Sequence, residues 1–299
     1  MSTAAAVPET WDVSGAGAWA TARRTGLGRL LIGAAARLRA ADGFSHARSM
    51  AYVTSLIAMQ GLIALVGLTS ALGSSISPSA RRLVEATAPG PVGDALSTAI
   101  DQARSAGQAG RTTALTFGLV GSLVTAASGM GQLQRSLNRL YGLEADRPTS
   151  SKYRLATVLA LTAGTLITLA FVLLATGSAL GKTLEDNRLT PVWGVTRIVL
   201  SAVLLVVGVA LLFRWCPYRR QPGWSWLALG AGVSVTGWVL VTALLGLVFR
   251  YSSTFGRAYG SLAGIVALLL WALLSSVAML FGASVAAELE AVRASHRED

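Results

Sequence analysis

The chain has 299 residues, of which 53% are hydrophobic and only 13% are charged, and its mean hydropathy is +0.57. Soluble domains carry about 25% charged residues, so a chain this poor in charge cannot cover a water-soluble globule of this size. The net charge of +11 would suit nucleic-acid binding in a soluble protein, but the basic residues stand between long apolar runs, which favours anionic lipid head groups over nucleic acid.

The N-terminal segment, residues 1–45, is expected on the cytoplasmic side and carries one helical pattern. Between about Ala16 and Ala41, apolar residues recur at helical spacing and arginines supply the charge. The apolar positions are Leu27, Leu30, Leu31, Ala34 and Leu38. Such an amphipathic helix either lies on the membrane surface or packs beneath a helix bundle, and both alternatives stay open.

Residues 46–290 contain six apolar stretches of the length that a membrane span needs, about 20 residues. They are 50–72, 112–133, 155–180, 192–213, 226–249 and 262–287. Because backbone groups in lipid must bond within their own segment, these stretches are expected to be helices. The sequence therefore predicts an all-α polytopic membrane protein, a bundle of six transmembrane helices with amphipathic interfacial helices, followed by a cytoplasmic tail at 291–299.

The distribution of lysine and arginine predicts the orientation. If the N-terminus is inside, the inside segments hold 16 of the 25 basic residues and the outside segments hold 9. Basic residues accumulate on the cytoplasmic side, so both termini are expected in the cytoplasm. The long outer loop, 73–111, shows one apolar helical face after Pro91, and we expect short amphipathic helices there.

Small residues recur at helical spacing inside the predicted spans. The pairs are Gly260 with Gly264, Gly118 with Ser122, Gly230 with Ser234, and Gly282 with Ala286. Small residues allow helices to approach closely in lipid, and this is the leading interpretation. The alternative is that Gly129 and Gly131 break the second span beside a substrate site.

Side chains that could carry chemistry are scarce. No Asp, Glu or Lys lies deep in a predicted span, the single cysteine is Cys216, and the two histidines, His46 and His296, stand near opposite ends of the chain. No catalytic residue, metal site or cofactor is therefore expected. Two uncharged amides inside or beside the spans, Gln60 and Gln132, are typical of hydrogen bonds between helices.

Two polar clusters stand at the ends of predicted spans. The first covers 137–142 and contains Asn138, Arg139 and Tyr141, and the second covers 214–220 and contains Pro217. Both are typical of interfacial anchors, in which aromatic rings lie at head-group depth and arginines face lipid phosphates.

Four segments together resemble the YihY family, also called the virulence factor BrkB family. They are Ala51-Tyr52-Val53-Thr54, Leu137-Asn138-Arg139-Leu140-Tyr141, Cys216-Pro217-Tyr218-Arg219, and Tyr259-Gly260-Ser261-Leu262-Ala263-Gly264 followed by Trp271 and Leu280-Phe281-Gly282-Ala283. The chain departs from the family pattern at Gln60, where the family usually has a proline, and at Tyr218, where it often has asparagine.

The resemblance implies six spans in a bacterial cytoplasmic membrane, with cytoplasmic termini. It also implies transport or envelope maintenance with a lipid-like or amphiphilic cargo. The alternative is a non-catalytic scaffold that binds partners through its basic cytoplasmic face. Membrane lipids are the expected partners, together with a second copy of the chain or another membrane protein, and nucleic acid is not.

Some members of the family carry the label ribonuclease BN. A zinc-dependent nuclease needs several clustered His and Asp ligands, which two distant histidines do not supply, so the chain is not expected to be an enzyme. The candidate functional or structural positions are Gln60, Gln132, Asn138, Arg139, Tyr141, Pro217, Tyr259, Gly260 and Gly264.

Overall fold

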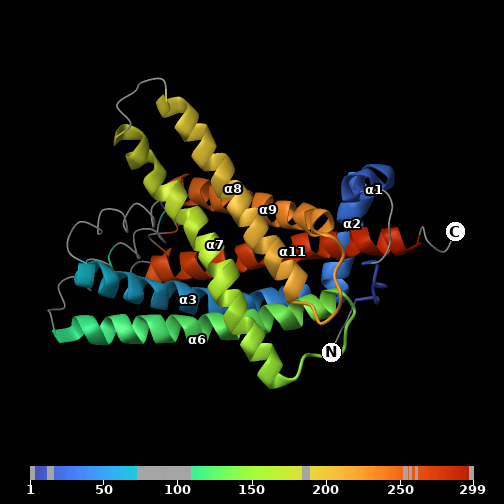
Figure 1. The fold of residues 1–299 in the computed structure, drawn as a ribbon, viewed down its shortest axis with the longest axis horizontal. Helices are drawn as coiled ribbons and strands as arrows, with labels where there is room; N and C mark the ends of the chain where they lie inside the picture. Colours follow the sequence, from blue (N-terminus) through green and yellow to red (C-terminus); the bar gives the residue numbers. More distant parts are fainter. Residues whose placement is uncertain are drawn as a thin grey trace.

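The structure is a computed structural model that describes residues 4–11, 17–72, 90, 98, 109–183, 189–251, 255, 258–259 and 262–295 (Figure 1). This described part contains eight longer helices and no strand: α1 (Ala18–Thr25), α2 (Leu27–Ala40), α3 (Gly43–Leu72), α6 (Ala109–Leu140), α7 (Thr149–Thr183), α8 (Leu189–Trp215), α9 (Trp224–Tyr251) and α11 (Ala263–Ser295). The predicted all-helical class is confirmed. The short helices expected near Pro91 lie in a stretch of which the structure describes only single residues.

Six of these helices coincide in order and position with the six predicted spans. The shortest of them, α8, has 27 residues, and a helix of that length extends about 40 Å, which exceeds a hydrocarbon core of about 30 Å. Four ranges are both long and apolar enough to cross a membrane: Thr149–Leu174, Val192–Trp215, Trp224–Tyr251 and Ala263–Ser295. These four ranges support a membrane protein.

The helices run past the apolar stretches that predict them. Helix α3 begins at Gly43, α6 continues through Asn138 to Leu140, and α11 extends to Ser295. A helix need not end where its apolar run ends, because polar residues outside the hydrocarbon can continue the same backbone hydrogen bonding. These extensions bring polar side chains to the ends of the bundle.

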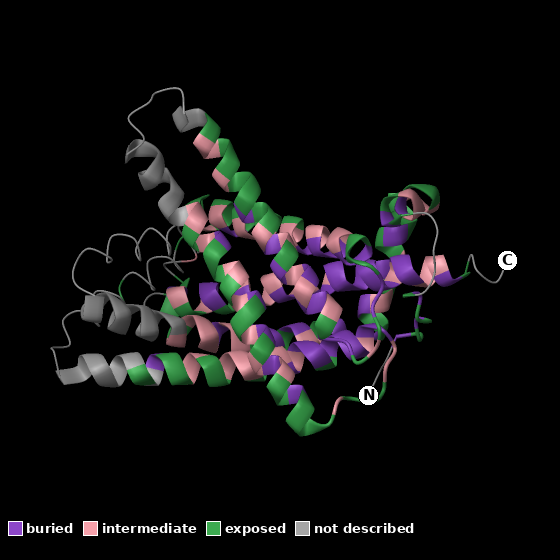
Figure 2. Ribbon diagram, viewed as in Figure 1, coloured by how far each residue is buried: buried purple, intermediate pink, exposed green. Residues whose placement is uncertain are grey.

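The long helices form a bundle with a tilted pair laid across it. Helices α3, α6, α9 and α11 run roughly alongside one another, whereas α7 and α8 pair with each other and slant across them (Figure 1). Both chain termini lie at one end of the bundle (Figure 1). Buried residues gather toward this end (Figure 2), which we call the terminal end.

The N-terminal pattern forms two helices where the sequence predicted one. Gly26 separates α1 from α2 with a φ of +84°, a conformation that glycine adopts without steric cost. Leu30, Ala34 and Leu38 form the buried face of α2. Leu30 and Ala34 pack in a cluster with Trp226, Val285 and Leu289 of α9 and α11, and Leu38 packs in the main core. Packing against the bundle, one of the two alternatives, is therefore confirmed.

The small-residue pairs of α9 and α11 meet each other. A Cβ atom built on Gly230 would lie 2.6 Å from the carbonyl oxygen of Gly282 and 2.7 Å from Cβ of Ala286. Ser234, one turn along α9, donates a hydrogen bond to the carbonyl of Met279, 3.1 Å away. The predicted close approach is confirmed here, since neither glycine leaves room for a side chain.

The alternative of a broken second span is wrong. Helix α6 continues without interruption through Gly129 and Gly131. A Cβ atom on Gly129 would lie 3.0 Å from a methyl carbon of Val53 in α3. This glycine therefore lets α3 and α6 pack closely.

Candidate functional site

The polar side chains of the terminal end form one connected cluster, which we call the terminal junction. It comprises residues 4–11, 138–147, 215–221 and 288–290. The N-terminal segment enters it through backbone bonds, in which the amides of Ala4 and Val7 donate to the carbonyls of Arg139 and Tyr141, each over 3.2 Å. The end of α6, the connection from α8 to α9 and the end of α11 supply the rest.

Asn138 joins two connections of the bundle. It lies in the last turn of α6 and is buried. Its Oδ1 accepts a hydrogen bond from the amide of Tyr218 (2.8 Å), and its Nδ2 donates to Asp146 (2.7 Å). Burial acts to raise the pKa of Asp146, but the bonds from Asn138 and from Lys152, 3.0 Å away, outweigh it, so the pKa is lowered. The carboxylate therefore stays ionised at neutral pH.

Arg147 holds the turn that follows α8. Its guanidinium donates to the carbonyl oxygens of Trp215 (2.9 Å), Cys216 (3.1 Å) and Pro217 (3.0 Å). The last carbonyls of a helix have no partner within the helix, and a cationic donor near that end also complements the helix dipole. Pro217 thus contributes a carbonyl and a rigid turn, and its role is structural.

A buried ion pair lies at the centre of the terminal junction. Arg219 Nη2 lies 2.8 Å from Glu290 Oε1, and the two side chains are 2% and 0% exposed. Thr10 donates to the same carboxylate oxygen from its amide (3.2 Å) and its hydroxyl (3.0 Å). Arg219 also donates to the carbonyls of Val7 (3.0 Å) and Pro8 (3.2 Å). The pair therefore fastens the N-terminal segment to α11.

The ring of Tyr141 packs against the guanidinium of this ion pair. The guanidinium carbon of Arg219 lies 4.9 Å from the centre of the Tyr141 ring. Burial, and then the charge of Glu290, raise the pKa of the phenol well above its usual value. Tyr141 consequently stays neutral and acts as a cation–π surface for Arg219.

The expectation that the second cluster faces lipid phosphates is wrong for Arg219. Its charge is directed inward to Glu290, and Arg214 likewise donates to the carbonyl of Pro222 over 2.7 Å. Trp215 and Tyr218 are exposed, as interfacial aromatics would be. Nothing in the sequence pairs Glu290 with Arg219 or Thr10, because these partners are 71 and 280 positions from it along the chain.

The remaining candidate positions are dispersed. Gln60 accepts a hydrogen bond from the Thr125 hydroxyl (2.6 Å), and the Nε2 of Gln132 lies 3.5 Å from Nδ1 of His46. Each of these pairs links α3 to α6, in agreement with the structural interpretation of the two amides. Exposed Tyr259 packs on Phe255 with ring centres 4.8 Å apart. Gly264 lies in the first turn of α11, and Gly260 lies outside the described residues.

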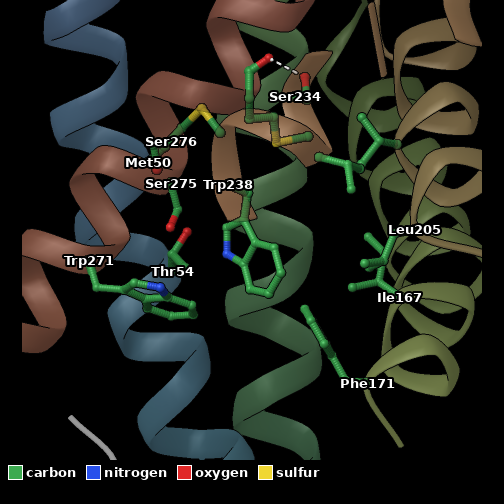
Figure 3. A pocket seen from close by; sticks show the side chains of 13 residues that line it. Met50, Thr54, Ile167, Phe171, Leu205, Ser234, Trp238, Trp271, Ser275 and Ser276 are labelled. Atoms are coloured by element: carbon green, nitrogen blue, oxygen red, sulfur yellow. Dashed lines mark hydrogen bonds between the residues drawn. The ribbon is translucent and has the colours of Figure 1, made fainter. Parts of the chain in front are cut away.

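An apolar cavity of about 250 Å³ lies within the bundle, between α3, α7, α8, α9 and α11. In Figure 3 the indole of Trp238 stands between Trp271 and Phe171, and its ring centre is 5.4 Å from that of Phe171 and 6.5 Å from that of Trp271. Among the described residues, the buried hydroxyl of Ser275 has no hydrogen-bond partner. The cavity thus offers an aromatic wall and the hydroxyls of Thr54, Ser234, Ser275 and Ser276.

A second hollow, of about 640 Å³, separates α6 from α7 beside Ile57 of α3. We call it the α6–α7 groove. Its walls are mostly apolar with a few hydroxyls, among them Ser122, Thr165 and Thr168. The groove arises because α7 slants across α6 instead of running along it (Figure 1).

Replacing Asn138 by alanine should destabilise the protein by about 2 kcal/mol, because the amide of Tyr218 and the carboxylate of Asp146 would each lose a buried partner. Arg135→Ala, on the same helix, is the control. It removes only a half-exposed contact, 3.5 Å from Asp146, and should cost less than about 1 kcal/mol. Thermal unfolding in detergent, followed by tryptophan fluorescence, measures both, and equal losses would contradict the role of Asn138.

The comparisons with known proteins match a region that includes the cavity, the groove and the terminal junction apart from its residues 4–11. The family model described as virulence factor BrkB matches residues 34–299. The chain is 26% identical over 180 residues to the putative ribonuclease-like protein YfkH of Bacillus subtilis, a match that covers 58% of this chain and 65% of the relative, just under two thirds. No solved structure matches the chain. Within the described ranges, no group of three or more His, Cys, Asp or Glu is placed to hold a metal ion.

Proposed function

The chain belongs to the virulence factor BrkB family, and we propose that it is a six-span protein of the bacterial cytoplasmic membrane that moves a lipid-like amphiphile. The observation that carries the proposal is the pair of apolar hollows, the cavity among α3, α7, α8, α9 and α11 and the α6–α7 groove. A bundle that served only as a scaffold would have no need of a cavity among its helices.

Six spans account for the architecture. Four described ranges meet the length and apolarity that a membrane requires, and α3 and α6 are of similar length and pack against each other and the bundle. With an even number of spans both termini lie on one side, as in Figure 1. The excess of basic residues on that side supports a cytoplasmic location.

The chemistry of the hollows favours hydrocarbon as cargo. The cavity volume, about 250 Å³, lies just below the usual range for ligand pockets, about 300–1,000 Å³, so it fits one chain of a lipid better than a whole lipid. An ion would lack compensating charge on these walls. A cargo chain would enter by the groove, while the polar head group stays outside the hydrocarbon.

The alternative function, a scaffold that acts through a basic cytoplasmic face, receives less support. Several arginines of the terminal end donate to groups of the protein itself: Arg37 to Glu288, Arg147 to the carbonyls after α8, Arg214 to Pro222 and Arg219 to Glu290. These charges stabilise the fold and are not presented to a partner.

Movement of a fluorescent phospholipid across liposomes that contain the purified chain tests the proposal. Ser275→Trp places an indole in the cavity and should slow transfer about tenfold, equivalent to about 1.4 kcal/mol of lost binding. Val235→Phe, also on the cavity wall, should give a smaller decrease. The control is Val207→Trp, which enlarges an exposed residue of α8 and should transfer lipid at the unaltered rate.

Three results would contradict the proposal: no lipid movement with the unaltered chain, equal rates for Ser275→Trp and Val207→Trp, or faster transfer when the cavity is filled. Melting curves in detergent establish that each variant is folded before its transfer rate is compared.

A further inference from the structure

Helices α1 and α2 form an appendage at the terminal end that has two apolar sides. Figure 1 shows that α2 runs across the direction of α3, α6 and α11. One side of α2 is occupied by α9 and α11, through buried Leu30 and Ala34. Arg37 fixes this arrangement with a bond of 2.9 Å to Glu288.

A second apolar side of α2 is not covered by the bundle. Leu27 and Leu31 are 55% and 41% exposed. They are one turn apart and adjoin the buried face, whereas exposed Arg29, Ile32 and Ala36 lie on the other side of the helix. A helix that needed only to pack on the bundle would carry polar residues at these exposed positions.

The appendage is strongly cationic. Its sequence from Gly17 to Ala41 contains no Asp or Glu. Exposed arginines occupy both helices: Arg23, Arg24, Arg29 and Arg39. Arg23 also lies over the exposed ring of Trp19, 5.1 Å from its centre. Exposed leucines, an interfacial tryptophan and unneutralised positive charge together are the features of helices that lie in an anionic membrane surface.

We propose that α1 and α2 bind the anionic surface of the bilayer, with Leu27 and Leu31 inserted among the lipid chains and the arginines on phosphate groups. If the long helices cross the membrane, α2 lies parallel to its plane because it runs across them. Arg37 and Glu288 then hold the helix at the level of the head groups. The lipid bound here is a phospholipid with an anionic head group. The surface is separate from the proposed cargo path.

Depth measurements with a fluorophore on α2 test the inference. Leu31→Cys and Ala36→Cys are labelled in the full chain, since the two positions lie about 140° apart around the helix. The native Cys216 is buried and its pKa is raised by that burial to about 12, so it should remain unlabelled. The proteins are reconstituted in phosphatidylcholine vesicles with or without phosphatidylglycerol.

A label at Leu31 should be quenched by lipids that carry a nitroxide, and a label at Ala36 by iodide in the water. Phosphatidylglycerol should raise the ratio of lipid quenching at Leu31 to lipid quenching at Ala36 by about fivefold, the change that one arginine near an anionic surface supplies. The triple variant Arg24→Gln, Arg29→Gln, Arg39→Gln should abolish that increase.

Equal access of iodide to both labels would overturn the inference and would indicate that a soluble protein partner, not lipid, covers the apolar side. A ratio that does not depend on phosphatidylglycerol would overturn the assignment to anionic lipid. Neither result bears on lipid transfer by Ser275→Trp, so this inference and the proposed function can fail separately.

Discussion

Replacing Arg219 by alanine is expected to lower the free energy of unfolding by about 3–5 kcal/mol, because it leaves the buried carboxylate of Glu290 without its counter-charge. Glu290 is fully buried, and its Oε1 accepts bonds from Arg219 and Thr10. The same guanidinium holds the carbonyls of Val7 and Pro8. The variant should therefore also release the N-terminal segment from the terminal junction.

Thermal unfolding in detergent measures the loss, and limited proteolysis near Thr10 reports the release of the segment. The matched control is Arg220→Ala, one position along the chain. Its side chain lies 4.8 Å over the exposed ring of Trp11, a contact of about 0.5–1 kcal/mol at an exposed site. An Arg219→Ala loss no larger than that of Arg220→Ala would show that the ion pair is dispensable.

A second variant separates charge from packing. Arg219→Met with Glu290→Leu replaces both charges with apolar side chains of comparable size, and replacement of a whole buried pair is often neutral or stabilising. The double variant should recover most of the stability that Arg219→Ala loses. If it remains as unstable as the single variant, the loss comes from the missing bonds to Val7 and Pro8 instead of from the unpaired carboxylate.

The positions of the long helices are predictable from the sequence because hydrophobic length is a local property. Each apolar run reports directly on the residues that must be covered by hydrocarbon. The helix ends are not predictable in this way, since the extension of α11 to Ser295 depends on contacts with α1 and α2. Glu290 stands beyond the apolar run, where no local pattern predicts burial, and the N-terminal segment buries it.

The candidate site is only partly visible in the sequence. Asn138, Tyr141 and Pro217 are singled out because they stand in short polar clusters between apolar runs. Their partners are not, because the bonds from Tyr218 to Asn138 and from Thr10 to Glu290 join residues 80 and 280 positions apart. The cavity is harder still to foresee. Trp238 and Phe171 resemble lipid-facing aromatics until the fold brings them together.

The spacing of small residues predicted where each helix is approached closely, but it did not predict which helices meet. Gly230 and Gly232 are two positions apart in α9, and only Gly230 belongs to a predicted pair, with Ser234. In the structure, a Cβ atom on Gly230 would collide with the backbone of α11, whereas a Cβ atom on Gly232 would meet nothing within 4 Å. That the Gly230 face of α9 turns to Gly282 of α11 depends on the packing of the whole bundle, and a spacing rule alone does not contain it.

Replacing Gly230 by valine should therefore cost about 3 kcal/mol, at the upper end of overpacking. Its Cβ atom would lie 2.6 Å from the carbonyl oxygen of Gly282, a backbone atom that cannot rotate away. Gly232→Val is the matched control: the change in side chain is the same, the position is open, and stability should change by less than about 1 kcal/mol. Melting curves of both variants in one detergent provide the comparison. Similar curves would mean that α9 and α11 are not in close contact at Gly230. The packing of α9 on α11 beside the neighbouring cavity would then be wrong.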